Sequence, residues 1–141
     1  MPPYSLRRSL WAGPVSTISA VLVGILYYAV TRAFGEQYVM PLDGSVSHLG
    51  PMPVLMPIFA ILVPGLVASI LFGLLVRFSR TPATVFLSVS IAALILSLGG
   101  PFNLPGAVMQ TKILLSGMQV ITAVLIVGGT LFLSHKKNQI P

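Results

Sequence analysis

The sequence predicts an all-α membrane protein, an antiparallel bundle of four transmembrane helices that forms one domain over residues 1–141. Hydrophobic residues make up 55% of the 141 residues and charged residues only 7%, whereas soluble globular domains carry roughly 25% charged residues. Four apolar segments reach or approach the roughly 20 residues that a helix needs to cross a hydrocarbon core of about 30 Å. None of these segments has Asp, Glu, Lys, Arg or His in its interior. We therefore expect lipid to surround them.

The first predicted span covers residues 12–31 and follows Arg7 and Arg8. It is longer than the apolar part of a signal peptide and lacks a clear cleavage site, so we interpret it as a retained helix. Pro14 suits the first turn of this helix, where its missing N–H costs little. The second span covers residues 54–76, and Pro64 in its interior predicts a kink.

The third span covers residues 82–100, and Thr81 followed by Pro82 is typical of a helix N-cap with proline at the first helical position. Glycine and proline in "GGPFNLPG", residues 99–106, are expected to stop this helix. The fourth span covers residues 113–134. Because the links beside the third span are short, spans two and three are expected to form an antiparallel hairpin.

The first loop, residues 35–53, is the longest segment outside the spans. Its Asp43-Gly44 pair is typical of a β-hairpin turn. The sequence therefore allows a short β-hairpin in this first extracytoplasmic loop, although Pro41 argues against a long strand.

Basic residues predict the orientation of the bundle. Arg7, Arg8, Arg77, Arg80, Lys136 and Lys137 all fall on one side of the predicted membrane. The opposite side holds Arg32 and Lys112 with the only two acidic residues, Glu36 and Asp43. By the positive-inside rule, both termini are expected to be cytoplasmic in a multi-pass protein of the inner (plasma) membrane.

Three small residues, Gly65, Ser69 and Gly73, recur at every fourth position of the second span. Residues spaced by four lie on one helix face, so these three predict a groove for close helix packing. The groove could accept another helix of the same bundle, or it could form an interface with another protein. Replacing Gly65 or Gly73 with leucine should distinguish misfolding from loss of a partner.

The sequence shows no evident catalytic site, and we expect no enzymatic activity. It also predicts no cofactor and no metal site, because there are no cysteines and the two histidines, His48 and His135, fall on opposite sides of the membrane. The polar residue that stands out within a span is Gln119, whose amide is expected to find an intramembrane polar contact such as Ser90 or Ser97. An enzyme would need a cluster formed only by folding, for example Arg32, Glu36, His48 and Lys112.

Several motifs resemble those of a family of small bacterial four-helix membrane proteins that is known only as a domain of unknown function. They include Arg7-Arg8 with Trp11, "YYAVTRAFG", "RFSRTPATVF", "LSLGGPF" and "TKILLSGMQVITAVLIVGG". The resemblance covers roughly residues 8–133. It implies the same four-helix fold and no known activity or ligand.

Two functions remain from the sequence. The first is an accessory or structural subunit that packs against other membrane proteins or a second copy of itself, because small residues line several spans and little of the chain lies outside them. The alternative is a carrier or binder of a lipid-like small molecule, in a cleft opened by the kink at Pro64. Membrane lipid is the expected surrounding partner. Nucleic acid is not expected, because the net charge of +6 is spread over the helix ends and forms no basic stripe.

Overall fold

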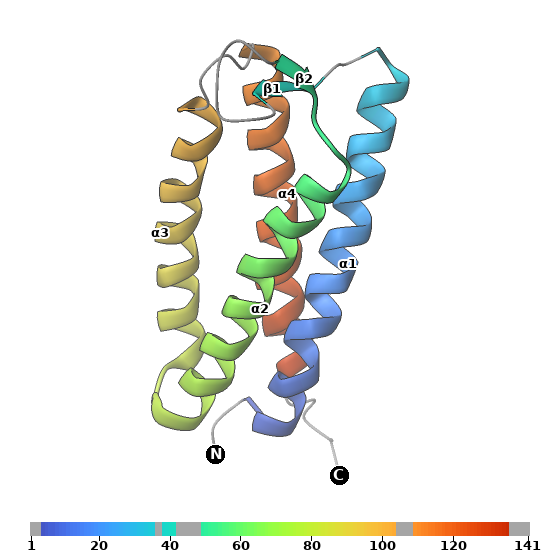
Figure 1. Ribbon diagram of the computed structural model, residues 1–141. Helices are drawn as coiled ribbons and strands as arrows, with labels where there is room; N and C mark the ends of the chain where they lie inside the picture. The colour runs from blue at the N-terminus through green and yellow to red at the C-terminus, as the bar shows by residue number, and fades with distance from the viewer. Residues whose placement is uncertain (1–3, 36–37, 42–48, 104–108, 136–141) are drawn as a thin grey trace.

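The structure, a computed structural model, describes residues 4–35, 38–41, 49–103 and 109–135. In this part of the chain, the elements follow the order α1 (Leu6–Ala33), β1 (Val39–Pro41), β2 (Leu49–Pro51), α2 (Leu55–Phe78), α3 (Pro82–Phe102) and α4 (Met109–Ser134). Figure 1 shows the helices side by side along one axis, with the two strands at one end. All four helices are long and apolar enough to cross a membrane. The predicted four-helix bundle is confirmed, and the chain is a small multi-pass membrane protein.

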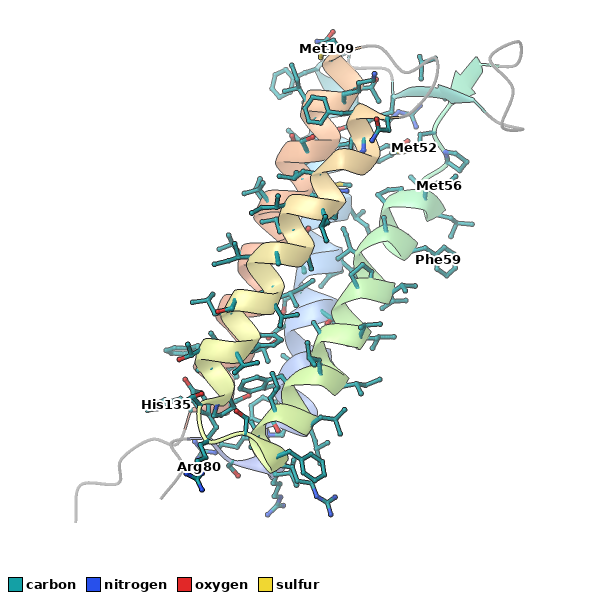
Figure 2. The ribbon with its side chains drawn as sticks, turned by 90° about the vertical axis from the view of Figure 1, so that its left-hand side faces the viewer. Met52, Met56, Phe59, Arg80, Met109 and His135 are labelled. Atoms are coloured by element: carbon teal, nitrogen blue, oxygen red, sulfur yellow. The ribbon has the colours of Figure 1, made fainter. Side chains whose placement is uncertain are left out.

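The two ends of the bundle differ. One end, named here the termini end, holds the start of α1 and the end of α4, where the Ser5 N–H donates to the Ser134 carbonyl at 3.4 Å. The other, named the hairpin end, holds β1 and β2 (Figure 1). In Figure 2, Arg80 in the α2–α3 link lies at the same end as His135, and Met109 lies at the opposite end. Successive helices therefore run antiparallel.

α1 is the central helix, because both α2 and α4 pack along it. In the most apolar 18-residue stretch of α1, 39% of the residues are buried, against 11% in that of α3. α3 contacts α4 and, less extensively, α2. Side chains from three helices form the central core cluster: Ala20, Ile61, Met118 and Ile126. α3 therefore covers one side of the bundle and leaves most of its own surface exposed.

Two helices begin earlier than the sequence predicts. α1 begins at Leu6 and includes Arg7 and Arg8, because a helix can continue past the hydrocarbon into the polar interface. Pro14 therefore lies inside α1 and not in its first turn. α4 begins at Met109 and so includes Lys112, whose Nζ donates to the carbonyl of Phe102 at 3.1 Å. The cation thus satisfies a free carbonyl at the end of α3.

α3 begins at Pro82, as the sequence predicts, with Thr81 at the N-cap position. The Thr81 side chain makes no capping hydrogen bond. The backbone N–H of Thr81 donates to Ser79 Oγ at 3.2 Å. At the other end, α3 continues through Pro101 to Phe102, two residues beyond the approximate predicted end and within the segment 99–106 that was expected to stop it. A proline in the last turn removes one hydrogen bond and leaves the preceding turns intact.

β1 and β2 form a two-stranded antiparallel sheet in which Val39 pairs with Pro51, Met40 with Gly50 and Pro41 with Leu49. The Met52 N–H extends this pairing by donating to the Tyr38 carbonyl at 2.7 Å. The short β-hairpin that the sequence allowed is therefore present. Its predicted turn, Asp43-Gly44, lies outside the described residues.

Candidate functional site

The small-residue line of α2 faces α1 over two of its three positions. A Cβ atom added to Gly65 would meet the side chain of Thr17, and one added to Gly13 would meet the side chain of Ser69. Each glycine thus faces a hydroxyl residue of the other helix. Both hydroxyls bond within their own helix, from Thr17 Oγ1 to the Gly13 carbonyl at 2.9 Å and from Ser69 Oγ to the Gly65 carbonyl at 2.7 Å. Gly65 and Ser69 therefore hold α2 close to α1.

Gly73 has different surroundings. The residue is buried, but a Cβ atom added to it would meet nothing within 4 Å. Its neighbour in sequence, Phe72, is fully buried and packs against Phe86 of α3 with ring centroids 4.8 Å apart. Gly73 therefore follows a residue that packs on α3, and no close backbone approach requires it to be glycine.

The side-chain amide oxygen of Gln119 has no partner. This Oε1 atom is buried without a hydrogen bond, and the side-chain hydrogen bonds of α3 at Ser88 and Ser97 go to backbone carbonyls of α3 itself. The predicted contact from Gln119 to Ser90 or Ser97 is therefore absent at this oxygen. The Gln119 carbonyl does accept a hydrogen bond from Thr122 Oγ1 at 3.2 Å. An unpaired amide oxygen in a membrane span costs free energy.

A connected group of polar side chains, named here the Tyr28 cluster, lies at the hairpin end: Tyr28, Thr31, Arg32 and Tyr38. The Tyr28 hydroxyl donates to the Met52 carbonyl at 2.6 Å and accepts from Arg32 Nη1 at 3.2 Å. Thr31 Oγ1 and the Tyr38 hydroxyl lie 2.6 Å apart. The Arg32 guanidinium also lies over the Tyr28 ring, 5.6 Å from its centroid. These contacts fasten both strands' flanking residues to the end of α1.

A cavity of about 240 Å³ opens beside the Tyr28 cluster, and Val39, Pro51 and Met52 line its other walls. Two members of the cluster, Tyr28 and Tyr38, are nearly fully buried, whereas Arg32 is exposed. Of the outer-side cluster that the sequence suggested, the structure describes Arg32 and Lys112, and these two residues have different partners. Arg32 belongs to the cavity, Lys112 bonds to the end of α3, and Glu36 and His48 lie outside the described residues.

A second hollow, named here the α1–α4 groove, is larger and mostly apolar. It has a volume of about 400 Å³, and α2 and α3 contribute no lining residue; its wall consists of Ser16, Ser19, Val124, Leu125, Gly128, Gly129, Phe132 and Leu133. Ser16 is 3% exposed, and its Oγ atom has no hydrogen-bond partner. A Cβ on Gly129 would collide with Ser16, but a Cβ on Gly128 would meet nothing within 4 Å. Small residues therefore create the hollow.

The termini end combines aromatic rings with cations. Tyr4 makes edge-on contacts with both Phe72 and His135, at centroid distances of 5.5 Å and 5.4 Å. Arg8 Nη1 donates to the His135 carbonyl at 3.0 Å. Arg8 thus joins the start of α1 to the residue that follows α4, two positions after the groove residue Leu133.

Neither the Tyr28 cluster nor the α1–α4 groove was identified from the sequence. The spacing of Tyr28 and Arg32, four residues apart on one helix, was the available signal for the first. For the groove, the signal was Gly128-Gly129 in α4 opposite Ser16 of α1, but only the packing of α1 on α4 shows which small residues meet. Within the described residues, no three His, Cys, Asp or Glu side chains lie together in a way that could hold a metal ion.

Comparison with known protein families gives a match over most of the chain. The sequence model of a family described as "Family of unknown function (DUF6069)" matches residues 5–132. No curated protein and no solved structure matches the chain.

Proposed function

The chain belongs to this family of unknown function, DUF6069, and we propose from its structure that it is an accessory or structural subunit that packs against another membrane protein through α3. The proposal assigns it no catalytic reaction. It places the protein in the plasma membrane of a bacterium with the termini end in the cytoplasm. The orientation is supported by Arg7, Arg8, Arg77 and Arg80, which all lie at that end.

The observation that carries the proposal is the poor coverage of α3. In its most apolar window only 11% of the residues are buried, and its buried residues, Pro82, Phe86 and Pro101, lie near its two ends. The corresponding windows of α2 and α4 are 22% buried, so α3 leaves more of its surface than they do to lipid or to another helix. The middle of α3 is therefore available to another helix.

The exposed side of α3 also has the chemistry of a helix-packing surface. Thr84, Ser88 and Ala92 are exposed and follow one another at every fourth position. The Ser88 hydroxyl donates to the Thr84 carbonyl at 2.9 Å, so it offers a small, satisfied surface. Small residues permit the close backbone approach that stabilises helix pairs in lipid, where the hydrophobic effect contributes little.

Site-directed photocrosslinking in native membranes tests this proposal. A benzoylphenylalanine in place of Ala92 should give a discrete protein adduct, and the same probe in place of Ala60, an exposed alanine of α2, should give lipid adducts only. Ala92→Leu should abolish co-purification of the crosslinked protein, whereas the matched control Ala60→Leu should preserve it. Lipid adducts alone from both positions would refute the proposal.

A second candidate function is the binding of a lipid-like molecule. The α1–α4 groove supports it, because its wall is mostly apolar and it opens on a membrane-spanning part of the bundle. This function does not depend on α3, so the two candidates can be tested separately.

A further inference from the structure

We propose that the α1–α4 groove binds one acyl chain of an anionic phospholipid whose phosphate contacts Arg8. The inference rests on the second candidate function above and names its ligand. It combines an apolar hollow between two helices with an arginine at the membrane interface beside the end of that hollow.

The shape of the groove fits a hydrocarbon chain. Its α4 wall extends from Val124 to Leu133, which corresponds to about 14 Å along a helix axis. Val124 and Phe132 form exposed rims, 64% and 81% accessible, and Gly128 lies between them with free space beside it. An elongated depression with an apolar wall fits an extended hydrocarbon chain.

Arg8 lies on the same flank of α1 as the groove. It precedes the groove residue Ser19 by about three complete helical turns, so the two residues share one flank of α1. Its Nη1 atom donates to the carbonyl of His135, two residues after the groove residue Leu133. The groove therefore leads toward Arg8 at the termini end.

The arginines at the start of α1 have no acidic partner in the helices. The chain has two acidic residues, Glu36 and Asp43, and both follow the opposite end of α1 in the sequence. Arg7 and Arg8 thus have no carboxylate side chain of α1–α4 to pair with. A phosphate group is the anion that the membrane itself supplies at this depth, and arginine binds phosphate through charged hydrogen bonds.

The lipid headgroup determines which phospholipid the groove selects. An acyl chain that moves from the bilayer into an apolar groove gains little from the hydrophobic effect, because both surroundings are apolar. Packing in the groove holds the chain, and the headgroup decides which lipid stays. One hydrogen bond to a charged group changes affinity by roughly tenfold or more. The groove should therefore favour phosphatidylglycerol, which is anionic, over phosphatidylcholine, which carries a compensating cation.

Native mass spectrometry of the full-length protein in mild detergent tests the inference. Dioleoylphosphatidylglycerol and dioleoylphosphatidylcholine are added in equal amounts. Wild type should retain one lipid, with phosphatidylglycerol favoured by about tenfold. Arg8→Gln should lower this preference to near unity, and Arg8→Lys should preserve most of it because the positive charge remains. Arg80→Gln, a control at the same end of the bundle (Figure 2), should leave the preference unchanged.

A second pair of variants tests the groove itself. Gly128→Leu should fill it and reduce the retention of both lipids several-fold, whereas Gly100→Leu, at a glycine of α3 that also has free space, should have no effect. If Gly128→Leu fails to fold, Val124→Trp narrows the groove from its rim and should give the same loss.

Three results would overturn the inference. The first is equal retention of the two lipids by wild type; if Gly128→Leu still releases both, the groove binds lipid without selecting charge. The second is an undiminished preference in Arg8→Gln. The third is a dimer, lost in Gly128→Leu, that retains no lipid, because the groove would then hold a second copy of the chain.

Discussion

Gly65→Ala is the substitution that should most clearly reveal how α2 is held against α1. Gly65 lies at one of the close contacts of this helix pair, beside Thr17. The alanine variant adds one methyl group at that point and changes nothing else in composition. Gly73→Ala is a matched control on the same helix, because a Cβ there meets nothing within 4 Å.

The expected loss of stability in Gly65→Ala follows from the distances around Gly65. A Cβ on Gly65 would lie 2.6 Å from Thr17 Oγ1 and 3.0 Å from Thr17 Cβ, whereas non-bonded carbon atoms pack at about 3.5–4.0 Å. The helices must therefore separate by about 1 Å or Thr17 must leave its rotamer, and overpacking of this kind costs about 1–3 kcal/mol. Alanine also favours a helix over glycine by about 1 kcal/mol, and this gain applies equally to Gly73→Ala. The difference between the variants isolates the clash: Gly65→Ala should be about 1–3 kcal/mol less stable than Gly73→Ala.

Reversible unfolding by sodium dodecyl sulfate in mixed micelles provides the assay. The single tryptophan of the chain, Trp11, lies on α1 and reports by fluorescence on the separation of that helix. Thr17→Ala combined with Gly65→Ala should recover part of the loss, because it removes two of the three atoms that the new methyl group meets. Equal stability of the two single alanine variants would refute this account of the α1–α2 contact.

Two further predictions concern polar groups. Gln119→Leu should raise the free energy of unfolding by about 1–3 kcal/mol in the same assay, since it removes a buried oxygen without a partner; a destabilised variant would show that the amide makes a bond essential to the bundle. Tyr28→Phe should destabilise the hairpin end by about 1 kcal/mol, because the Met52 carbonyl and Arg32 lose a hydrogen-bond partner. Amide hydrogen exchange should then be faster at Met52 and unchanged at Phe72, and uniform acceleration at both amides would contradict a local role for Tyr28.

The bundle could be predicted because lipid imposes a simple requirement on sequence. Each span must be long, apolar and free of charge, and the loops then show which ends lie together. The exact boundaries followed less directly. Arg7 and Arg8 lie inside α1, and Pro101 lies inside the last turn of α3, because the polar interface permits a helix to continue beyond the hydrocarbon.

The candidate sites depended on distances between helices, which the sequence does not specify. The spacing of Gly65 and Ser69 indicated close packing, but only the structure shows Thr17 and Gly13 opposite them. The same spacing also selected Gly73, where an added Cβ atom would meet nothing within 4 Å. Tyr38 lies beyond the end of α1, and nothing in the spacing of residues 31 and 38 indicates that their hydroxyl groups lie 2.6 Å apart. Long-range contacts of this kind leave no periodic signal in the chain.

The central claim, that four helices cross a bilayer with the termini end in the cytoplasm, is tested most directly by cysteine accessibility. The chain contains no cysteine, so single variants carry no background. Thr81→Cys at the termini end should react with a membrane-impermeant maleimide only from the cytoplasmic side, and Asn103→Cys at the hairpin end only from the outside. Ile91→Cys, which is 51% exposed in the middle of α3, should react from neither side while the bilayer is intact. Reaction of Thr81→Cys and Asn103→Cys from the same side, or ready reaction of Ile91→Cys in intact membranes, would contradict the account.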